Sequence, residues 1–215
     1  QRGEDELALL QVVQDTGCNC IALECWSLFG MEMGFVPCVV AGDISGMGIP
    51  VSCETDVLGA ISSALLDAAV FGQKATFFAD LTIRHPENDN AELLWHCGPF
   101  PYVLKHKDSK AEMFMGKGSW KLQDGNITLA RFDALNGEYR LFSGEGKTCE
   151  GPETTETYVW FETNCWEHWE EVLINGPYIH HVSGIYGNYS EVLNEARKYM
   201  PGVASDSMSP HGLSL

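Results

Sequence analysis

The sequence is poor in basic residues. It holds 13 Lys and Arg against 30 Asp and Glu, which gives a formal net charge of −17. A surface of this sign repels phosphate backbones and anionic lipids, so nucleic acids and membrane surfaces are disfavoured as partners. Most of the excess acid is expected to keep the surface solvated, and the remainder is available to bind a cation.

Long apolar runs are also missing. No stretch reaches the roughly 18 apolar residues that a membrane-spanning helix needs. The opening segment, residues 1–5, carries neither a signal peptide nor another targeting pattern, so a cytoplasmic location is expected. That segment also lacks an initiator Met and leads directly into a helical pattern, so we expect the chain to be a fragment of a longer protein.

Standard cysteine frameworks are absent, although the chain contains eight cysteines. Cys18, Cys20, Cys25 and Cys38 have a spacing that matches no common zinc motif, and the other four cysteines are scattered singly. Free buried thiols are therefore predicted in place of disulfides.

The first third of the chain alternates helical and strand patterns. With 215 residues, 45% of them hydrophobic, the chain can bury a core as one large domain or two small ones. The predicted elements are helices at 5–15, 27–34 and 53–71 and a buried strand at 20–23. The glycine-rich segment 42–50 has no phosphate-loop spacing and is predicted to be a turn near a site. This alternation predicts the end of a parallel α/β/α domain over residues 1–74.

The pattern changes after Lys74. Residues 75–83 are predicted to be a strand, and strand-like pieces separated by Asp-Gly and Asn-Gly turn signals recur to about residue 183. Closely spaced antiparallel strands of this kind form a barrel or a sandwich. We therefore expect an α/β plus all-β protein, in which residues 75–215 form an antiparallel β-barrel-like domain. It would end in a short helix at 189–199 and a mobile tail after Gly202.

Three carboxylates have informative positions. Glu54 and Asp56 open the predicted helix at 53–71, where acids also complement the helix dipole by up to about 1 kcal/mol. Asp80 lies in an otherwise apolar strand, where an unpaired buried charge costs several kcal/mol. Asp80 is thus paired, hydrogen-bonded or bound to metal, unless it lies at the end of the strand.

Histidines occur in two later segments. His96 lies in an aromatic, turn-forming segment, and His180 and His181 are adjacent near the end of the β-rich region. Neighbouring residues of a strand point to opposite faces, so only one of these two is expected in a given site. Together with the acids they offer oxygen and nitrogen ligands without a thiolate, a set that suits Mn²⁺ or Mg²⁺ better than structural zinc.

Several of these residues lie in one ordered pattern. Residues 48–60 have the sequence G-I-P-V-S-C-E-T-D-V-L-G-A. The segments Phe78-Ala79-Asp80, His96-Cys97-Gly98 and His180-His181 follow it. In this order, from about residue 17 to 200, the chain resembles the L-fucose/L-arabinose isomerase superfamily. The resemblance implies that the metal-binding acids lie at the junction of a middle α/β domain and a C-terminal β-barrel domain.

The resemblance also implies roles for individual residues. Glu54 and Asp80 would bind Mn²⁺, or another divalent cation such as Mg²⁺ or Co²⁺, and would move a proton between C1 and C2 of a sugar through a cis-enediol. His181 would be a further metal ligand, preferred over His180, and His96 matches an extra histidine of the arabinose isomerase-like branch. Such enzymes have additional N-terminal regions that help form oligomers, so a homo-oligomer is expected for the full-length protein and weak or no activity for the fragment alone.

Two other functions stay open from the sequence. A metal-dependent lyase or epimerase acting on a sugar acid or a sulfonated sugar would use the same residues. A non-catalytic carbohydrate-binding module in the β-rich part would make Glu54 and Asp80 incidental. The sequence does not identify the sugar.

Overall fold

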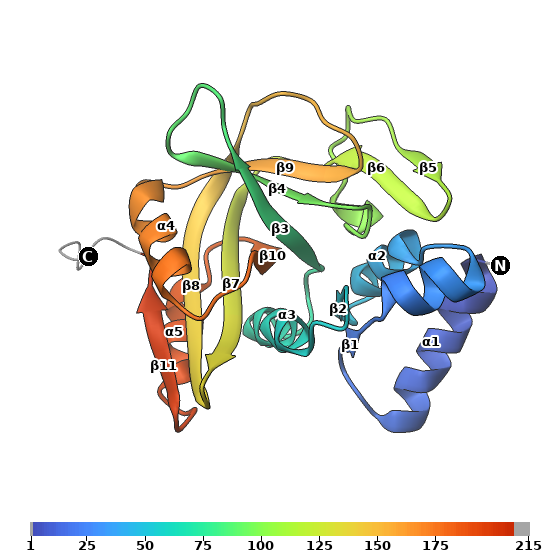
Figure 1. The fold of residues 1–215 in the computed structure, drawn as a ribbon, viewed down its shortest axis with the longest axis horizontal. Helices are drawn as coiled ribbons and strands as arrows, with labels where there is room; N and C mark the ends of the chain where they lie inside the picture. Colours follow the sequence, from blue (N-terminus) through green and yellow to red (C-terminus); the bar gives the residue numbers. More distant parts are fainter. Residues whose placement is uncertain (1, 209–215) are drawn as a thin grey trace.

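A large curled sheet dominates the computed structural model, which describes residues 2–208 (Figure 1). The sheet contains nine strands in the order β11-β8-β7-β10-β3-β4-β9-β6-β5. The strands are β3 (Thr76–Arg84), β4 (Ala91–His96), β5 (Glu112–Phe114), β6 (Lys117–Lys121), β7 (Asn126–Leu135), β8 (Glu138–Cys149), β9 (Thr157–Glu162), β10 (His181–Tyr186) and β11 (Val203–Ser207). The short 3₁₀ helix η2 (Tyr102–Leu104) lies between β4 and β5.

The predicted antiparallel β-barrel-like domain is only partly correct. β11 runs parallel to β8 and β6 runs parallel to β9, so the sheet is mixed. The end of β8 also pairs with β9, through residues 147–149, and this curls the sheet toward itself. Because that ladder covers only three residues of β8 and the outer strands continue past it, the sheet is not a closed barrel.

The N-terminal part alternates helices with two short strands, as predicted. Its elements are α1 (Arg2–Thr16), β1 (Ile21–Ala22), the π-helix η1 (Cys25–Met33), α2 (Cys38–Gly46), β2 (Val51–Ser52) and α3 (Val57–Ala69). β1 and β2 pair in parallel in a small separate sheet. The prediction of a turn over 42–50 is wrong for its first half, which continues α2. A Cβ on Gly42 would lie 2.8 Å from the carbonyl oxygen of Pro99, so this glycine allows a close backbone approach within a helix.

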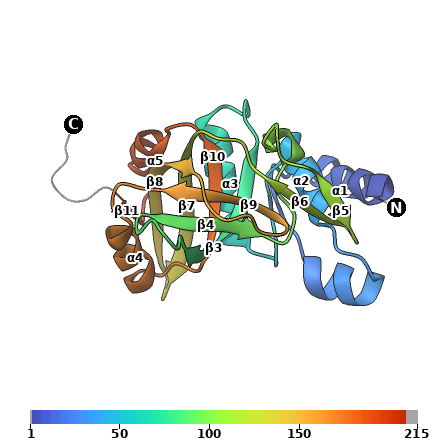
Figure 2. The same ribbon diagram turned by 90° about the horizontal axis from the view of Figure 1, so that it is seen from above.

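Helix α3 joins the two parts of the molecule. It packs against β7 and β10 on one side and contacts β1 and β2 on the other (Figures 1 and 2). Its buried Leu66 lies in one cluster with Ala130 of β7 and Ile185 of β10. The division into domains at 1–74 and 75–215 stays a prediction, because α3 belongs to the first range in sequence and to both parts in its packing.

The main hydrophobic core lies within the curl of the sheet. It is rich in aromatic side chains from several strands, including Phe77, Phe142 and Phe161, and helix α4 (Trp166–Asn175) adds Trp166 and Trp169. Burying one side chain of this size stabilises the fold by about 1.5–3 kcal/mol before other terms are counted.

The C-terminal region differs from the prediction in one respect. The closing helix is present as α5 (Ser190–Arg197), but the expected mobile tail is wrong for Val203–Ser207, which forms β11 beside β8. Asp206 holds this strand through Arg140 and the hydroxyl of Tyr178, which donates to it. Residues 209–215 of the predicted tail lie outside the described range.

All eight cysteines are free thiols, as predicted, but only Cys25, Cys38, Cys53 and Cys97 are buried. None of the helices within residues 2–208 combines the length and the apolar character needed to cross a membrane.

Candidate metal centre

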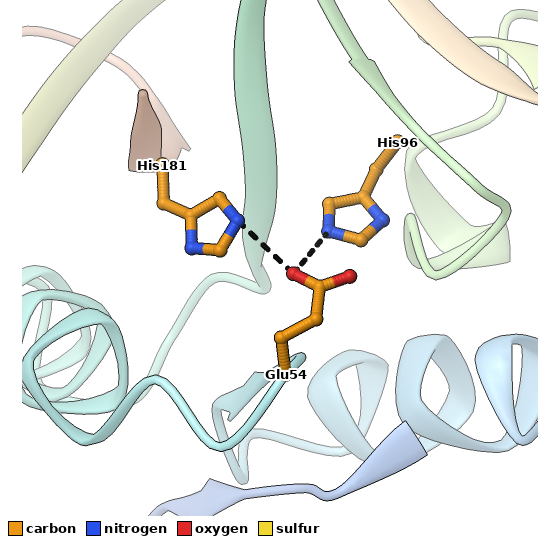
Figure 3. A group of neighbouring side chains, drawn as sticks. All are labelled: Glu54, His96 and His181. Atoms are coloured by element: carbon orange, nitrogen blue, oxygen red, sulfur yellow. Dashed lines mark ion pairs between the residues drawn. The ribbon is translucent and has the colours of Figure 1, made fainter. Parts of the chain in front are cut away.

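Four side chains predicted from the sequence converge at one place (Figure 3 shows three of them). Glu54 comes from the turn between β2 and α3, Asp80 from β3, His96 from the end of β4 and His181 from the start of β10. Asp80 is directly opposite His181 in the β3–β10 ladder, and its other neighbour in β4 is Trp95, next to His96. Residues opposite each other in a ladder present their side chains on the same face, so sheet register brings Asp80 and His181 together, whereas His96 joins them from the last position of β4.

Glu54 occupies a turn and not the helix that was predicted for it. Glu54 and Thr55 both have left-handed backbones, with φ of 55° and 57°, and α3 starts only at Val57. Non-glycine residues in this conformation cost of order 1 kcal/mol each, so contacts must hold the turn. The hydroxyl of Thr55 donates to Glu24 at 2.5 Å, and the amide of Glu54 donates to the sulfur of Cys25 at 3.4 Å.

The Glu54 carboxylate contacts two side chains. Its Oε2 lies 3.0 Å from Nε2 of His181, and its Oε1 accepts a hydrogen bond from the indole of Trp26 at 3.1 Å. The hydrogen bond from His181, together with the charge of His96 and the indole bond, outweighs partial burial and lowers the pKa of Glu54. Glu54 is therefore an anion that faces imidazole nitrogens.

Asp80 lies within its strand and not at the strand's end. Its Oδ1 is 3.4 Å from Nε2 of His181, 3.7 Å from Nε2 of His180 and 3.9 Å from Nε2 of His96. Burial raises the pKa of Asp80, and the neighbouring histidines offset only part of that rise. Oδ1 is buried and has no hydrogen-bond partner, which leaves a carboxylate oxygen free to bind a ligand.

His96 is almost completely buried, and its Nε2 faces the two acids. This nitrogen is 3.9 Å from Glu54 Oε2 and 3.9 Å from Asp80 Oδ1 and has no hydrogen-bond partner. Its Nδ1 accepts the backbone N–H of Cys97 at 2.9 Å and lies 3.3 Å from the Cys97 sulfur. Burial favours neutral His96, but the contact with Cys97 and the charge of Asp80 raise its pKa.

His181 is the centre of the cluster. Burial alone would lower its pKa, but hydrogen bonds to Asp56 and Glu54 and the charge of Asp80 raise the pKa of His181 to about 9.

His180 behaves differently from the prediction that only one of the pair enters a site. His180 precedes β10, so the alternation of side chains along a strand does not determine where its side chain points. The side chain is 63% exposed, yet its Nε2 lies 3.7 Å from Asp80 Oδ1.

These side chains fit a divalent cation. Potential ligand atoms of Glu54, His96 and His181 lie within 4.8 Å of one another, and so do those of Asp80, His180 and His181. Two neighbouring ligands of a six-coordinate cation lie about 3 Å apart when each is about 2.1 Å from the ion. Carboxylate oxygens and imidazole nitrogens are ligands that several divalent cations accept.

Sequence reasoning identified Asp56 only as an acid that opens a helix, and it missed Arg131 and Asp133 behind it. Asp56, at the N-cap of α3, contacts Nδ1 of His181 at 2.9 Å, and Arg131 and Asp133 of β7 lie behind it. Burial tends to raise the pKa of Asp56, but hydrogen bonds from His181 and Arg131 hold it far below its usual range. Arg131 and Asp133 alternate with apolar residues of a buried strand, the same signal that identified Asp80.

A family model matches the C-terminal part of the chain, from β5 to β11. Residues 112–206 match the C-terminal domain of L-fucose isomerase. The resemblance inferred from the sequence is therefore confirmed for this region.

Curated relatives match a longer stretch. Sulfoquinovose isomerase from Priestia aryabhattai is 29% identical over 196 residues, which cover 85% of this chain and 43% of that protein. The protein of the same name from Priestia megaterium (strain ATCC 12872 / QMB1551) gives the same values, and one from Alkalicoccus urumqiensis is 27% identical over 156 residues, 68% of this chain and 34% of that protein. The chain thus spans less than half the length of these relatives.

Proposed function

We propose that this chain carries the metal site of an aldose–ketose sugar isomerase, with Glu54, Asp80, His181 and His96 as the ligands of Mn²⁺ or a similar divalent cation. One observation carries the proposal: Asp80 Oδ1 and His96 Nε2 are buried without partners and face the same cluster of acids and imidazoles. Burying such atoms unpaired costs about 1–3 kcal/mol each, and a bound cation would remove that cost.

The reaction that this site supports is the transfer of a proton between C1 and C2 of an open-chain sugar. One of the two carboxylates, Glu54 or Asp80, removes the proton from carbon, and the other moves a proton between the two oxygens. When bound, a divalent cation supplies charge stabilisation for the developing enediolate. Trp26, whose indole bonds Glu54 and whose side chain is half exposed, borders the site and offers a surface for the sugar.

A sulfonated hexose is the first substrate to test, because the relatives described above are sulfoquinovose isomerases. We also propose that the full-length protein acts in the cytoplasm as a homo-oligomer. The support for these two points is the family resemblance.

The experiment uses the full-length protein, stripped with chelator and reloaded with Mn²⁺. Ketose formation is measured from sulfoquinovose, L-fucose, D-arabinose and L-arabinose, beside Glu54→Gln, Asp80→Asn and the control Asp206→Asn, whose carboxylate pairs with Arg140 in β8. We expect metal-dependent turnover of at least one sugar that both site variants lose and the control keeps.

Other outcomes identify the alternatives. Tight Mn²⁺ binding without a ketose product from any sugar would favour the lyase or epimerase. Sugar binding that survives both site substitutions would favour a carbohydrate-binding module. Absence of Mn²⁺ binding would overturn the proposed metal site.

A further inference from the structure

The two nitrogens of His181 serve different partners. Nε2 faces Glu54 at 3.0 Å and Asp80 at 3.4 Å, whereas Nδ1 lies 2.9 Å from Oδ2 of Asp56 on the other side of the ring. Asp56 is partly buried and fixed at the N-cap of α3, where Oδ1 accepts the backbone N–H of Gly59 at 2.9 Å. The ring is therefore held between the acids of the site and a separate carboxylate.

A buried arginine fixes Asp56 in turn. Arg131, only 1% exposed, donates from Nη1 and Nη2 to the two carboxylate oxygens of Asp56, and its Nε donates to Asp133 at 2.9 Å. Asp133 also accepts the backbone N–H of Ile179 at 3.3 Å, two residues before His181. A buried guanidinium requires such pairing, and here the pairing ties α3, β7 and the start of β10 together.

These contacts define the direction of the hydrogen bond between Asp56 and His181. Both oxygens of Asp56 already receive N–H donors, two from Arg131 and one from Gly59. A carboxylate surrounded by donors acts as an acceptor, so Nδ1 of His181 must donate. A metal-binding imidazole commonly donates its second N–H to a carboxylate in this way, which sets the tautomer and the ring orientation.

We propose that Asp56, oriented by Arg131, holds a proton of His181 on Nδ1 and so makes Nε2, which faces Glu54 and Asp80, the nitrogen that binds a divalent cation together with these two acids. Asp56 and Arg131 are thus positioning residues for the metal centre. This inference rests on the proposed function. It also separates two roles of Asp56, because the N-cap of α3 contributes to stability whereas the contact with His181 acts on metal affinity.

The first test is calorimetric titration of the full-length protein with Mn²⁺. Asp56→Asn keeps the side-chain shape, but its amide can donate to Nδ1 and favour the opposite tautomer. We expect Mn²⁺ affinity to fall about 10- to 100-fold in Asp56→Asn and in the same direction in Arg131→Lys, which loses the two-pronged contact. Asp206→Asn, which removes the charge from the separate Arg140–Asp206 pair, should bind Mn²⁺ like the unmodified protein.

The second test does not depend on metal. In protein labelled with nitrogen-15 histidine, the Nδ1–H of His181 should give a downfield proton signal that His181→Gln identifies by its loss. We expect this signal in the unmodified protein and in Asp206→Asn, and its loss in Asp56→Asn. Absence of the signal from the folded, unmodified protein would overturn the proposal even if Asp56→Asn failed to fold.

The outcomes distinguish this inference from the proposed function. If Glu54→Gln loses Mn²⁺ binding while Asp56→Asn and Arg131→Lys keep it, the positioning role alone is overturned. This holds whatever the change in melting temperature. No Mn²⁺ binding by the unmodified protein would overturn the metal centre and the positioning role with it.

Discussion

The two acids of the candidate metal centre lie in opposite electrostatic environments. Hydrogen bonding from His181 lowers the pKa of Glu54, whereas burial raises the pKa of Asp80. A carboxylate with a raised pKa is the stronger base, and proton transfer is most efficient when the pKa approaches the working pH. In the protein alone, Asp80 is therefore the better proton acceptor, and Glu54 is the more permanent negative charge.

His96 has two possible tautomers, and one substitution distinguishes their consequences. In the structure Nδ1 accepts the Cys97 amide, which makes Nε2 of neutral His96 a donor. His96 binds a metal through Nε2 when the proton lies instead on Nδ1, directed at the sulfur of Cys97. We expect His96→Gln to weaken Mn²⁺ binding by at least about tenfold, as measured by calorimetry, because a ligand is lost. Unchanged Mn²⁺ affinity with a lower kcat would assign His96 the donor role and contradict ligation.

Glu92 should make stability depend on pH. It is buried in β4, and its cross-strand partner Arg84 is engaged by Glu170 at 3.1 and 3.2 Å. Burial therefore raises the pKa of Glu92 to about 7, with the charge of Arg84 offsetting only part of the rise. Because the folded state then holds a proton that the unfolded state releases, the free energy of unfolding falls as pH rises from about 4.5 to 7.

The measurement for Glu92 is urea unfolding at pH 5 and pH 8. We expect Glu92→Gln to be more stable than the unmodified protein by about 1–3 kcal/mol at pH 8, with a smaller gain at pH 5, since one pKa unit corresponds to about 1.4 kcal/mol. Glu171→Gln, on the partly exposed surface of α4, serves as the control and should show no such difference. An equal effect of Glu92→Gln at both pH values would contradict the raised pKa.

At the scale of single residues, the sequence predicted the acids and histidines of the site because a spaced motif carries them. It did not reveal that Asp56 contacts His181 or that Arg131 contacts Asp56. Their contact joins residues 75 positions apart, and the Arg131 signal, a charge in an apolar strand, identifies burial without identifying the partner. Register brought Asp80 opposite His181, and register depends on pairings that local pattern does not specify.

At the scale of elements, periodicity located most segments but not their ends. The helix predicted from residue 53 begins at Val57 because Glu54 and Thr55 adopt left-handed backbones held by Glu24 and Cys25. Helix α2 includes glycines that a pattern-based reading assigns to a turn. Strand β11 lacks the apolar alternation of a buried strand, and it forms because β8 offers an unpaired edge.

The attachment of β11 gives a prediction at this scale. Asp206 receives the guanidinium of Arg140 and the hydroxyl of Tyr178. Because this group is partly exposed, we expect Asp206→Asn to lower the free energy of unfolding by only about 1 kcal/mol. The loss should be accompanied by faster amide hydrogen exchange in Val203–Ser207 and unchanged exchange in α3, measured by mass spectrometry. Equal exchange in β11 of both proteins would show that backbone pairing alone holds the strand.

At the scale of the whole molecule, the metal centre connects parts that are distant in the chain. Glu54 belongs to the N-terminal part beside the small sheet, whereas Asp80, His96 and His181 belong to three neighbouring strands of the large sheet. A cation bound by all of them would hold the two parts together, in addition to the packing of α3. The predicted boundary near residue 74 therefore runs through the site, and metal binding should be linked to the stability of both parts.

This linkage gives a prediction for metal removal. A ligand that binds only the folded state stabilises it by about 2.7 kcal/mol at a free concentration one hundred times its Kd. We expect Mn²⁺ to raise the melting temperature of chelator-treated full-length protein, because each kcal/mol shifts the transition of a 150–250-residue domain by roughly 2–4 °C and that of a longer chain by less. Glu54→Gln should lose the shift, since it removes the ligand from the N-terminal part, and Asp206→Asn should keep it. A shift of equal size in Glu54→Gln would place the stabilising cation elsewhere and separate metal binding from the junction of the two parts.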